Sequence, residues 1–218
     1  MKRAGPSYCR FRGFPTRFAR DESGSTLVEL GVVLPIFLLI FLGLIDFGRM
    51  AFHFVTAEKA VQAAARIAVV RPAACPGVPD FIARGTTSVT PPPKFGTSCN
   101  AGANICENPG VIQCSGSAAN ATANEVWTIV RGAFPNDATI ANLSFSYSFD
   151  TNMGFLGGPY TPVVTVEVQN LNFQFISPLA DLVGLTGGTA PAGLGATFNF
   201  PALSASMPAE DLAQGESG

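Results

Sequence analysis

The longest apolar run in the chain lies near its start. Sixteen uncharged residues, 30–45, separate Glu29 from Asp46, and at 1.5 Å per residue they form a helix of about 24 Å. The uncharged residues 25–28 on one side and the largely apolar residues 50–55 on the other lengthen this run. The total matches the roughly 30 Å hydrocarbon core of a bilayer. The pattern therefore predicts a transmembrane helix.

The apolar pattern continues beyond Asp46 with the three- and four-residue spacing of an amphipathic helix. The recurring apolar side chains are Phe47, Phe54, Val61, Ala65 and Ala68. Pro72 then ends the helix. We expect one transmembrane and continuing helix over residues 25–71, about 70 Å long. Its exported half leaves a flank that a small domain covers incompletely, which favours packing against other subunits.

The remainder of the chain predicts an α+β fold. Residues 72–118 are rich in Pro, Gly, Ser and Asn and form a Cys-rich loop. A short helix is expected over residues 118–134. Alternating or β-branched runs predict three strands, over residues 143–149, 163–173 and 196–207. A small antiparallel sheet of about three strands with a packed helix is the simplest arrangement, in an exported α+β domain over residues 119–210 followed by a disordered tail, residues 211–218.

Charge is distributed unevenly along the chain. Six of the 13 Lys and Arg residues and two of the 15 acidic residues precede Gly24, so this leader carries +4 and the rest carries −6. Positive charge before a span predicts a basic cytoplasmic leader, residues 1–24, with the C-terminal part exported. An apolar run this long argues against a cleaved secretory signal, and a buried core helix is the other rejected reading. The acidic body offers no surface for nucleic acid.

Five cysteines divide according to this topology. Cys9 falls in the leader and is expected to be a free thiol, whereas Cys75, Cys99, Cys106 and Cys114 fall on the exported side. An even number in an oxidising compartment predicts two disulfides that pin the Cys-rich loop. Their spacing does not match a zinc site. Three pairings are possible, and spacing does not choose among them.

No catalytic or cofactor motif is present in the sequence. There is no nucleophile elbow, no phosphate-binding glycine loop and no acid with a matching base. The sole histidine, His53, lies among aromatic residues beside the span, as an interfacial side chain would. Asp150, Asn152 and Gly154 are more typical of a turn than of a calcium loop. We therefore expect no enzymatic activity, no catalytic residue, no metal and no cofactor.

The start of the apolar run resembles a known processing motif. Residues 24–30, GSTLVEL, follow a short basic leader and precede an apolar helix, as in type IV prepilins. Within that superfamily the segment resembles the TadE-like proteins of tight-adherence (Flp) pilus systems. The positions that carry this resemblance are Glu29, Leu34, Pro35, Gly43, Asp46, Gly48, Arg49, Ala64, Ala65 and Arg66. The match covers residues 22–71.

The resemblance implies a minor pilin or pseudopilin of the inner membrane that acts in pilus biogenesis, adhesion and secretion. A prepilin peptidase would cut after Gly24 and leave Ser25 as the new N-terminus. Glu29 would serve subunit assembly, because a carboxylate in lipid is costly unless it is paired. The Ser25 ammonium of a neighbouring subunit would supply that partner. The implied partners are the peptidase, other pilin and pseudopilin subunits, the inner-membrane assembly platform and membrane lipid.

Two other functions remain open at this point. The chain could be an uncleaved single-pass protein whose exported domain scaffolds a secretion complex or binds a ligand. It could also be an anchored hydrolase with an unrecognised site. The mass of the membrane-extracted protein separates the first from a processed pilin, and an activity screen tests the second.

Overall fold

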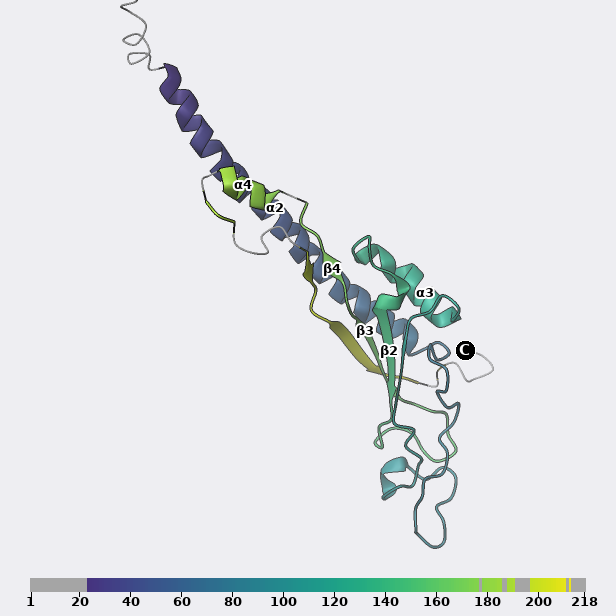
Figure 1. Ribbon diagram of the computed structural model, residues 1–218. Helices are drawn as coiled ribbons and strands as arrows, with labels where there is room; N and C mark the ends of the chain where they lie inside the picture. The colour runs from purple at the N-terminus through teal and green to yellow at the C-terminus, as the bar shows by residue number, and fades with distance from the viewer. Residues whose placement is uncertain (1–22, 177, 186–187, 191–196, 211, 213–218) are drawn as a thin grey trace, which may run out of the picture. The chain divides into compact units, whose positions relative to one another are not determined.

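A computed structural model describes residues 23–176, 178–185, 188–190, 197–210 and 212 (Figure 1). Most of the basic leader, including Cys9, and the tail apart from Leu212 lie outside the described residues. The chain divides into two compact units. One comprises Met1–Ile45 and Ile176–Gly195, and the other comprises Asp46–Phe175 and Ala196–Gly218.

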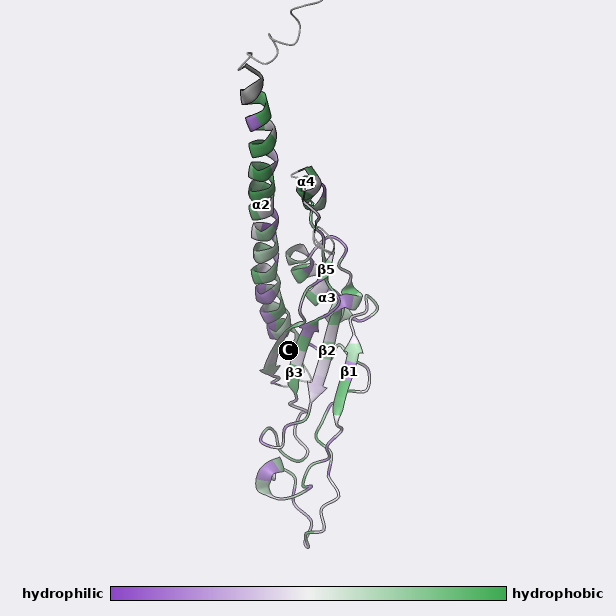
Figure 2. Ribbon diagram, turned by 60° about the vertical axis from the view of Figure 1, so that its left-hand side comes forward, coloured by the Kyte–Doolittle hydropathy of each residue, from purple (hydrophilic) through white to green (hydrophobic). Residues whose placement is uncertain are grey.

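The long helix expected from the apolar pattern is confirmed. Helix α2 spans Ser23–Ala68, 46 residues, against the expected 25–71. Its first part belongs to the first unit and consists mainly of hydrophobic residues, as the green ribbon in Figure 2 shows. Most of their side chains are exposed. Pro35 lies inside this part without ending the helix. The first unit also contains the short helix α4, Leu179–Leu185, in which Leu179 and Leu182 are buried.

A four-stranded antiparallel sheet forms the centre of the second unit. Its order is β1-β2-β3-β6. The strands are β1 (Val111–Ser115), β2 (Leu143–Ser148), β3 (Val163–Val168) and β6 (Leu203–Pro208). The α+β class is thus confirmed, with one strand more than the three expected. Strand β1 lies in the segment that the sequence predicted to be a Cys-rich loop. Sequence reasoning missed this strand because its five residues are too few to show a clear alternation next to so many turn formers.

Two of the expected strands are each divided. The run 163–173 breaks after β3, where Asn170 adopts a positive φ of 56°, and resumes as β4, Asn172–Phe173. The run 196–207 contains β5, Phe198–Asn199, before β6. Pro201 lies between these two strands and cannot donate a ladder hydrogen bond. Strands β4 and β5 pair with each other as a separate two-stranded sheet.

Helix α3, Ala121–Val130, runs beside the last part of α2. Its N-cap Asn120 accepts a hydrogen bond from the Ala123 N–H at 2.9 Å, which satisfies one of the free donors of the first turn. Thr122 Oγ1 donates to the Pro72 carbonyl at 2.7 Å. At the other end of α3, Thr56 Oγ1 donates to the Ala133 carbonyl at 3.4 Å. The two helices are therefore antiparallel neighbours.

One face of the sheet and the two helices enclose the core. The sheet contributes its alternate residues, and the buried helix residues are mostly alanines and valines. The buried members on α2 are Ala57, Ala60, Val61, Ala64, Ala65 and Ala68. The buried members on the middle strands are Leu143, Phe145, Tyr147, Val164, Val166 and Val168. The opposite face of the sheet is rich in Ser and Thr, so this sheet is apolar on one side only.

All four cysteines of the second unit form disulfides. Cys75 is bonded to Cys114 and Cys99 to Cys106, so the second bridge lies within the loop closed by the first. The first joins the segment after α2 to strand β1. Short bridges such as Phe81 to Pro159 connect the loops of this region to each other. The Cys-rich segment is therefore tied to strand β1 and to the loop between β2 and β3.

Candidate functional site

The processing and assembly residues expected from the sequence lie at the start of α2. Gly24 and Ser25 fall within its first turn, and Glu29 follows Ser25 by four residues. Residues four apart lie on one face of a helix, one turn from each other. Glu29 is exposed and takes part in an interaction within the structure. A carboxylate at this position is thus carried on the surface of the apolar helix.

One described helix is long and apolar enough to cross a membrane. It is α2 over Thr26–Ala68, and its most apolar stretch is not buried in the structure. The exposed large side chains of this stretch include Val32, Phe37, Ile40 and Leu44. Large exposed apolar surfaces are rare on soluble proteins. The structure therefore provides one candidate membrane anchor.

The charged residues that follow this stretch belong to the second unit. Asp46 is only 1% exposed, and Arg49 Nη1 lies 3.3 Å from its Oδ1. Arg49 also stacks over the Phe173 ring, 5.6 Å from the centroid. Sequence reasoning used Asp46 as the end of the apolar run and both residues as positions of the family resemblance, and it did not predict an ion pair between them. Their three-residue spacing, which places them on one helix face, was the signal for an ion pair.

An aromatic cluster lies beside Arg49. The rings of Phe173, Phe175, Phe198 and Phe200 lie with centroids 5.5 to 6.3 Å apart. His53 contributes to the cluster, with its ring 6.1 Å from Phe173. Aromatic pairs at such distances add about 0.5–1.5 kcal/mol each beyond their buried area. Sequence reasoning did not find the cluster, because the four phenylalanines lie in two segments that pair only in the fold.

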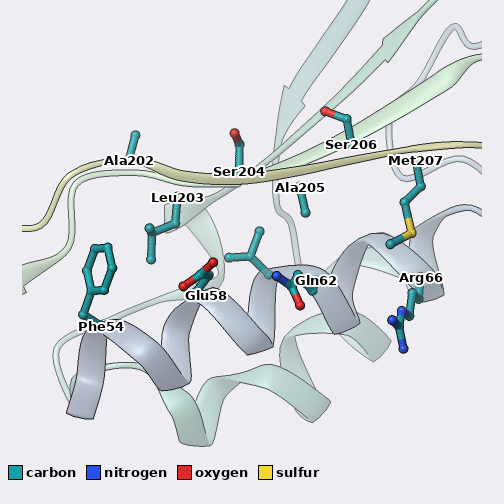
Figure 3. A pocket seen from close by; sticks show the side chains of 11 residues that line it. Phe54, Glu58, Gln62, Arg66, Ala202, Leu203, Ser204, Ala205, Ser206 and Met207 are labelled. Atoms are coloured by element: carbon teal, nitrogen blue, oxygen red, sulfur yellow. The ribbon is translucent and has the colours of Figure 1, made fainter. Parts of the chain in front are cut away.

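A groove of about 710 Å³ runs between α2 and strand β6 (Figure 3). Its floor and walls come entirely from the second unit. Glu58, Gln62 and Arg66 line the helix side at successive turns, and the β6 side is built from small or apolar residues. The complete lining is Phe54, Glu58, Val61, Gln62, Arg66, Ala202, Leu203, Ser204, Ala205, Ser206 and Met207. The two opposite charges stand about two turns apart along the groove.

Strand β6 presents an open edge to this groove. It is the last strand of the sheet, and the Ala209 N–H donates to the Pro162 carbonyl across from it at 2.8 Å. Hydrogen-bonded residues alternate in an antiparallel pair, so Ala205 is bonded to β3. The N–H and C=O groups of Ser204 and Ser206 then point away from the sheet. An edge without charged side chains can accept a further strand.

Two buried tyrosines have perturbed acidity. Burial raises the pKa of Tyr147, and the hydrogen bond that its hydroxyl oxygen accepts from the Ala74 N–H lowers it in part; that bond is 2.8 Å long. Burial also raises the pKa of Tyr160, whose hydroxyl has no hydrogen-bond partner among the described residues. Both phenols stay protonated at neutral pH, so neither is a ready base.

Within the described parts of the chain, no three His, Cys, Asp or Glu side chains are grouped so that they could hold a metal ion. The expectations of no metal, no cofactor and no enzymatic activity stay predictions. His53 likewise remains an expected interfacial residue, and its ring contacts are with phenylalanines. The arrangement offers contact surfaces, namely the apolar helix and the groove beside β6.

Comparison with known proteins supports the resemblance seen in the sequence. The family model of the TadE-like protein matches residues 24–66. Comparison with curated proteins and with solved structures finds no significant match. The matched residues contain Glu29, the apolar stretch, the Asp46–Arg49 pair and the alanine-rich part of α2. Residues 24–66 are therefore identified as a TadE-like segment.

Proposed function

We propose that this protein is a minor pilin or pseudopilin of a tight-adherence pilus system, acting in pilus biogenesis and surface adhesion. The match of residues 24–66 to the TadE-like family, which suggests a pilus-associated protein, is the observation that carries the proposal. The fold agrees with it, because α2 joins an exposed apolar helix to a folded α+β unit. A pilin-type subunit would need both parts, because the apolar helix holds it in the bilayer before assembly and the folded unit is displayed on the pilus.

The proposed location is the inner membrane. The basic leader would stay cytoplasmic and the unit after Asp46 would be exported. The two disulfides support this orientation, since such bonds persist in oxidising compartments outside the cytoplasm. The partners would be the prepilin peptidase, other pilin subunits and the assembly platform of the pilus.

Glu29 would act in subunit assembly. In lipid, a carboxylate is stabilised by a cation held close to it. Cleavage after Gly24 would free an ammonium group at Ser25, one turn before Glu29, and a neighbouring subunit would present this ammonium to the carboxylate. Pairing between subunits then favours their removal from the bilayer into the assembly.

Two substitutions test processing and assembly separately. Gly24→Asp should keep the full precursor mass in membrane extracts, whereas the wild-type chain should lose residues 1–24. Glu29→Ala should be cleaved and inserted normally but should fail to copurify with the other pilin subunits. Glu58→Ala, which removes a carboxylate from the exported half of the same helix, is the matched control for cleavage and insertion.

The outcomes distinguish the proposal from its alternative. A wild-type chain that retains its leader would favour the uncleaved anchored domain. Normal copurification of Glu29→Ala would remove the assembly role from Glu29. An activity detected in the purified exported unit would instead favour an anchored hydrolase.

The groove beside β6 would be a second contact for a neighbouring subunit. An extended segment that adds to β6 would bond the outward N–H and C=O groups of Ser204 and Ser206, with its side chains over the helix row that contains Glu58 and Arg66. Its charge pattern would be basic near Glu58 and acidic near Arg66, which fixes its direction.

A proline scan of β6 tests this contact. Ser204→Pro removes an N–H that points away from the sheet, so the fold should survive while strand addition is lost. Ala205→Pro removes an N–H that bonds β3 and should destabilise the sheet. Unchanged copurification of the Ser204→Pro protein with other subunits would contradict the role of this edge.

A further inference from the structure

The chain between β4 and β5 forms an excursion, a segment that leaves the second unit and returns to it, and the pairing of β4 with β5 holds its two ends together. Phe173 is paired with Phe198 across the two strands. Phe175 also lies beside Phe198, with ring centroids 6.3 Å apart. The segment leaves the aromatic cluster after Phe175 and returns to it before Phe198. Its described part is residue 176, helix α4 with the preceding residue, and residues 188–190.

This excursion belongs to the same compact unit as the membrane anchor. Ile176–Gly195 groups with Met1–Ile45 and not with the sheet that precedes and follows it in the chain. Leu179 and Leu182 of α4 are buried within the structure. A segment that shares a compact unit with residues 26–45 shares their surroundings. If those residues lie in a bilayer, α4 lies at or in the bilayer as well.

The composition of the segment fits a lipid surface. Asp181 is its single charged residue. Two of its large side chains are far from buried, because Ile176 is 74% exposed and Leu185 is 72% exposed.

Asp181 sets the depth of this contact. A charged side chain in the middle of a bilayer costs roughly 2.5–3.5 kcal/mol or more, so Asp181 must stay near water. Interfacial helices lie in the membrane plane and bury their apolar side chains roughly 5–10 Å into the headgroup and acyl boundary. A contact of this depth keeps Asp181 among the headgroups while the exposed side chains of Ile176 and Leu185 enter the acyl boundary.

We propose that α4 is a second membrane contact, which inserts Leu185 and Ile176 into the lipid interface on the exported side while α2 spans the bilayer. The partner is a lipid surface. The inference rests on the proposed anchoring by α2 and adds a contact that the TadE-like segment does not contain. It would tether the exported unit close to the membrane until the subunit is extracted.

Tryptophan quenching by brominated lipid tests the proposal on the full-length chain. Trp127, the single tryptophan, is first replaced by Phe. One new tryptophan is then introduced by Leu185→Trp, by Phe37→Trp in the apolar part of α2, or by Ile129→Trp on α3. All three positions are more than half exposed, so each should accept the larger ring. Each protein is reconstituted in phosphatidylcholine vesicles with or without bromine on the acyl chains.

The expected result is loss of emission for the Leu185 and Phe37 probes and none for the Ile129 probe. A quenched Phe37 probe with a Leu185 probe as bright as that at Ile129 would overturn the inference and leave the anchoring intact. An unquenched Phe37 probe would overturn the anchoring itself, and the inference with it. Ile176→Trp gives an independent probe of the same segment, and adding Leu185→Asp to it should reduce its quenching.

Discussion

The two parts of helix α2 share one backbone geometry and have opposite surroundings. Between residues 26 and 45 its leucines, isoleucines, valines and phenylalanines are largely exposed, whereas between residues 57 and 68 five of its six alanines are buried. The difference lies in side-chain size. Small residues let α3 and the sheet approach the second part closely, while large apolar residues in the first part offer contact area to lipid. Helix formation alone therefore does not indicate what each part of α2 contacts, whereas the size of its apolar side chains does.

Loss of the disulfide between Cys75 and Cys114, the outer of the two nested bridges, should give the largest difference in stability between the two parts of the molecule. Replacing Cys75 and Cys114 together by Ser should lower the free energy of unfolding of the second unit by about 2–5 kcal/mol, since the bridge closes a long loop. Trp127 fluorescence during urea unfolding in detergent measures this. Removing the inner bridge through Cys99 and Cys106 is the control and should cost less, because its loop is short. An equal loss for both would contradict the loop-length argument.

Enlarging a buried alanine should be the next largest effect. Ala64 is completely buried, so Ala64→Leu should overpack the core and cost about 1–3 kcal/mol in the same urea experiment. The matched control is Val33→Leu in the exposed apolar part, which should change stability by less than about 0.5 kcal/mol. Similar tolerance at both positions would mean that the second part of α2 is not packed as described.

Alkaline pH should destabilise the second unit, which contains Tyr147. The folded pKa of Tyr147 is raised by burial, so the unfolded chain loses this proton first. Stability is fully present below the unfolded pKa of about 10 and falls as the pH rises above it, by up to about 1.4 kcal/mol per pH unit. Tyr147→Phe should reduce this slope. It should also cost about 1 kcal/mol at neutral pH, because the Ala74 N–H loses its acceptor. An unchanged slope would assign the alkaline loss to another group.

The ion pair between Arg71 and Glu125 should contribute least. Arg71 Nη2 lies 3.0 Å from Glu125 Oε1, but the two side chains are 48% and 40% exposed. Water and salt screen such pairs, so Arg71→Ala should cost roughly 0.2–1 kcal/mol. The cost should shrink at high salt and in a Glu125→Ala background. A large effect that persists in both conditions would show that Arg71 packs against the core instead.

The sequence predicted the long helix well because its signal is strong and local. The apolar run, its bounding charges and the alanine pattern each depend on neighbouring residues only, and α2 follows them to within a few residues. The sheet was predicted less completely. Strand β1 is recognisable only through its partner, since Cys114 faces Phe145 across the ladder and is held by a disulfide to a residue 39 positions away.

The candidate contact surfaces were likewise predicted only where a local motif marks them. Glu29 and Gly24 were found from a short motif, whereas the groove beside β6 joins residues of α2 to residues about 140 positions later in the chain. The aromatic cluster beside Arg49 was not predicted, although each of its phenylalanines is visible in the sequence. Such features depend on which segments pair in space, and a single sequence contains no local pattern for that.

The nested order of the disulfides has a consequence for how the protein is made. In the proposed topology the chain is exported from its anchor outward, and it would emerge with Cys75 first, then Cys99, Cys106 and Cys114. Oxidation in order of appearance would join Cys75 to Cys99, whereas the folded protein joins the first cysteine to the last and the two middle ones to each other. Correct bonding therefore has to wait until β1 has been delivered to the sheet, or be repaired by thiol exchange. In the proposed function, maturation would then depend on the thiol chemistry of the compartment as well as on the peptidase.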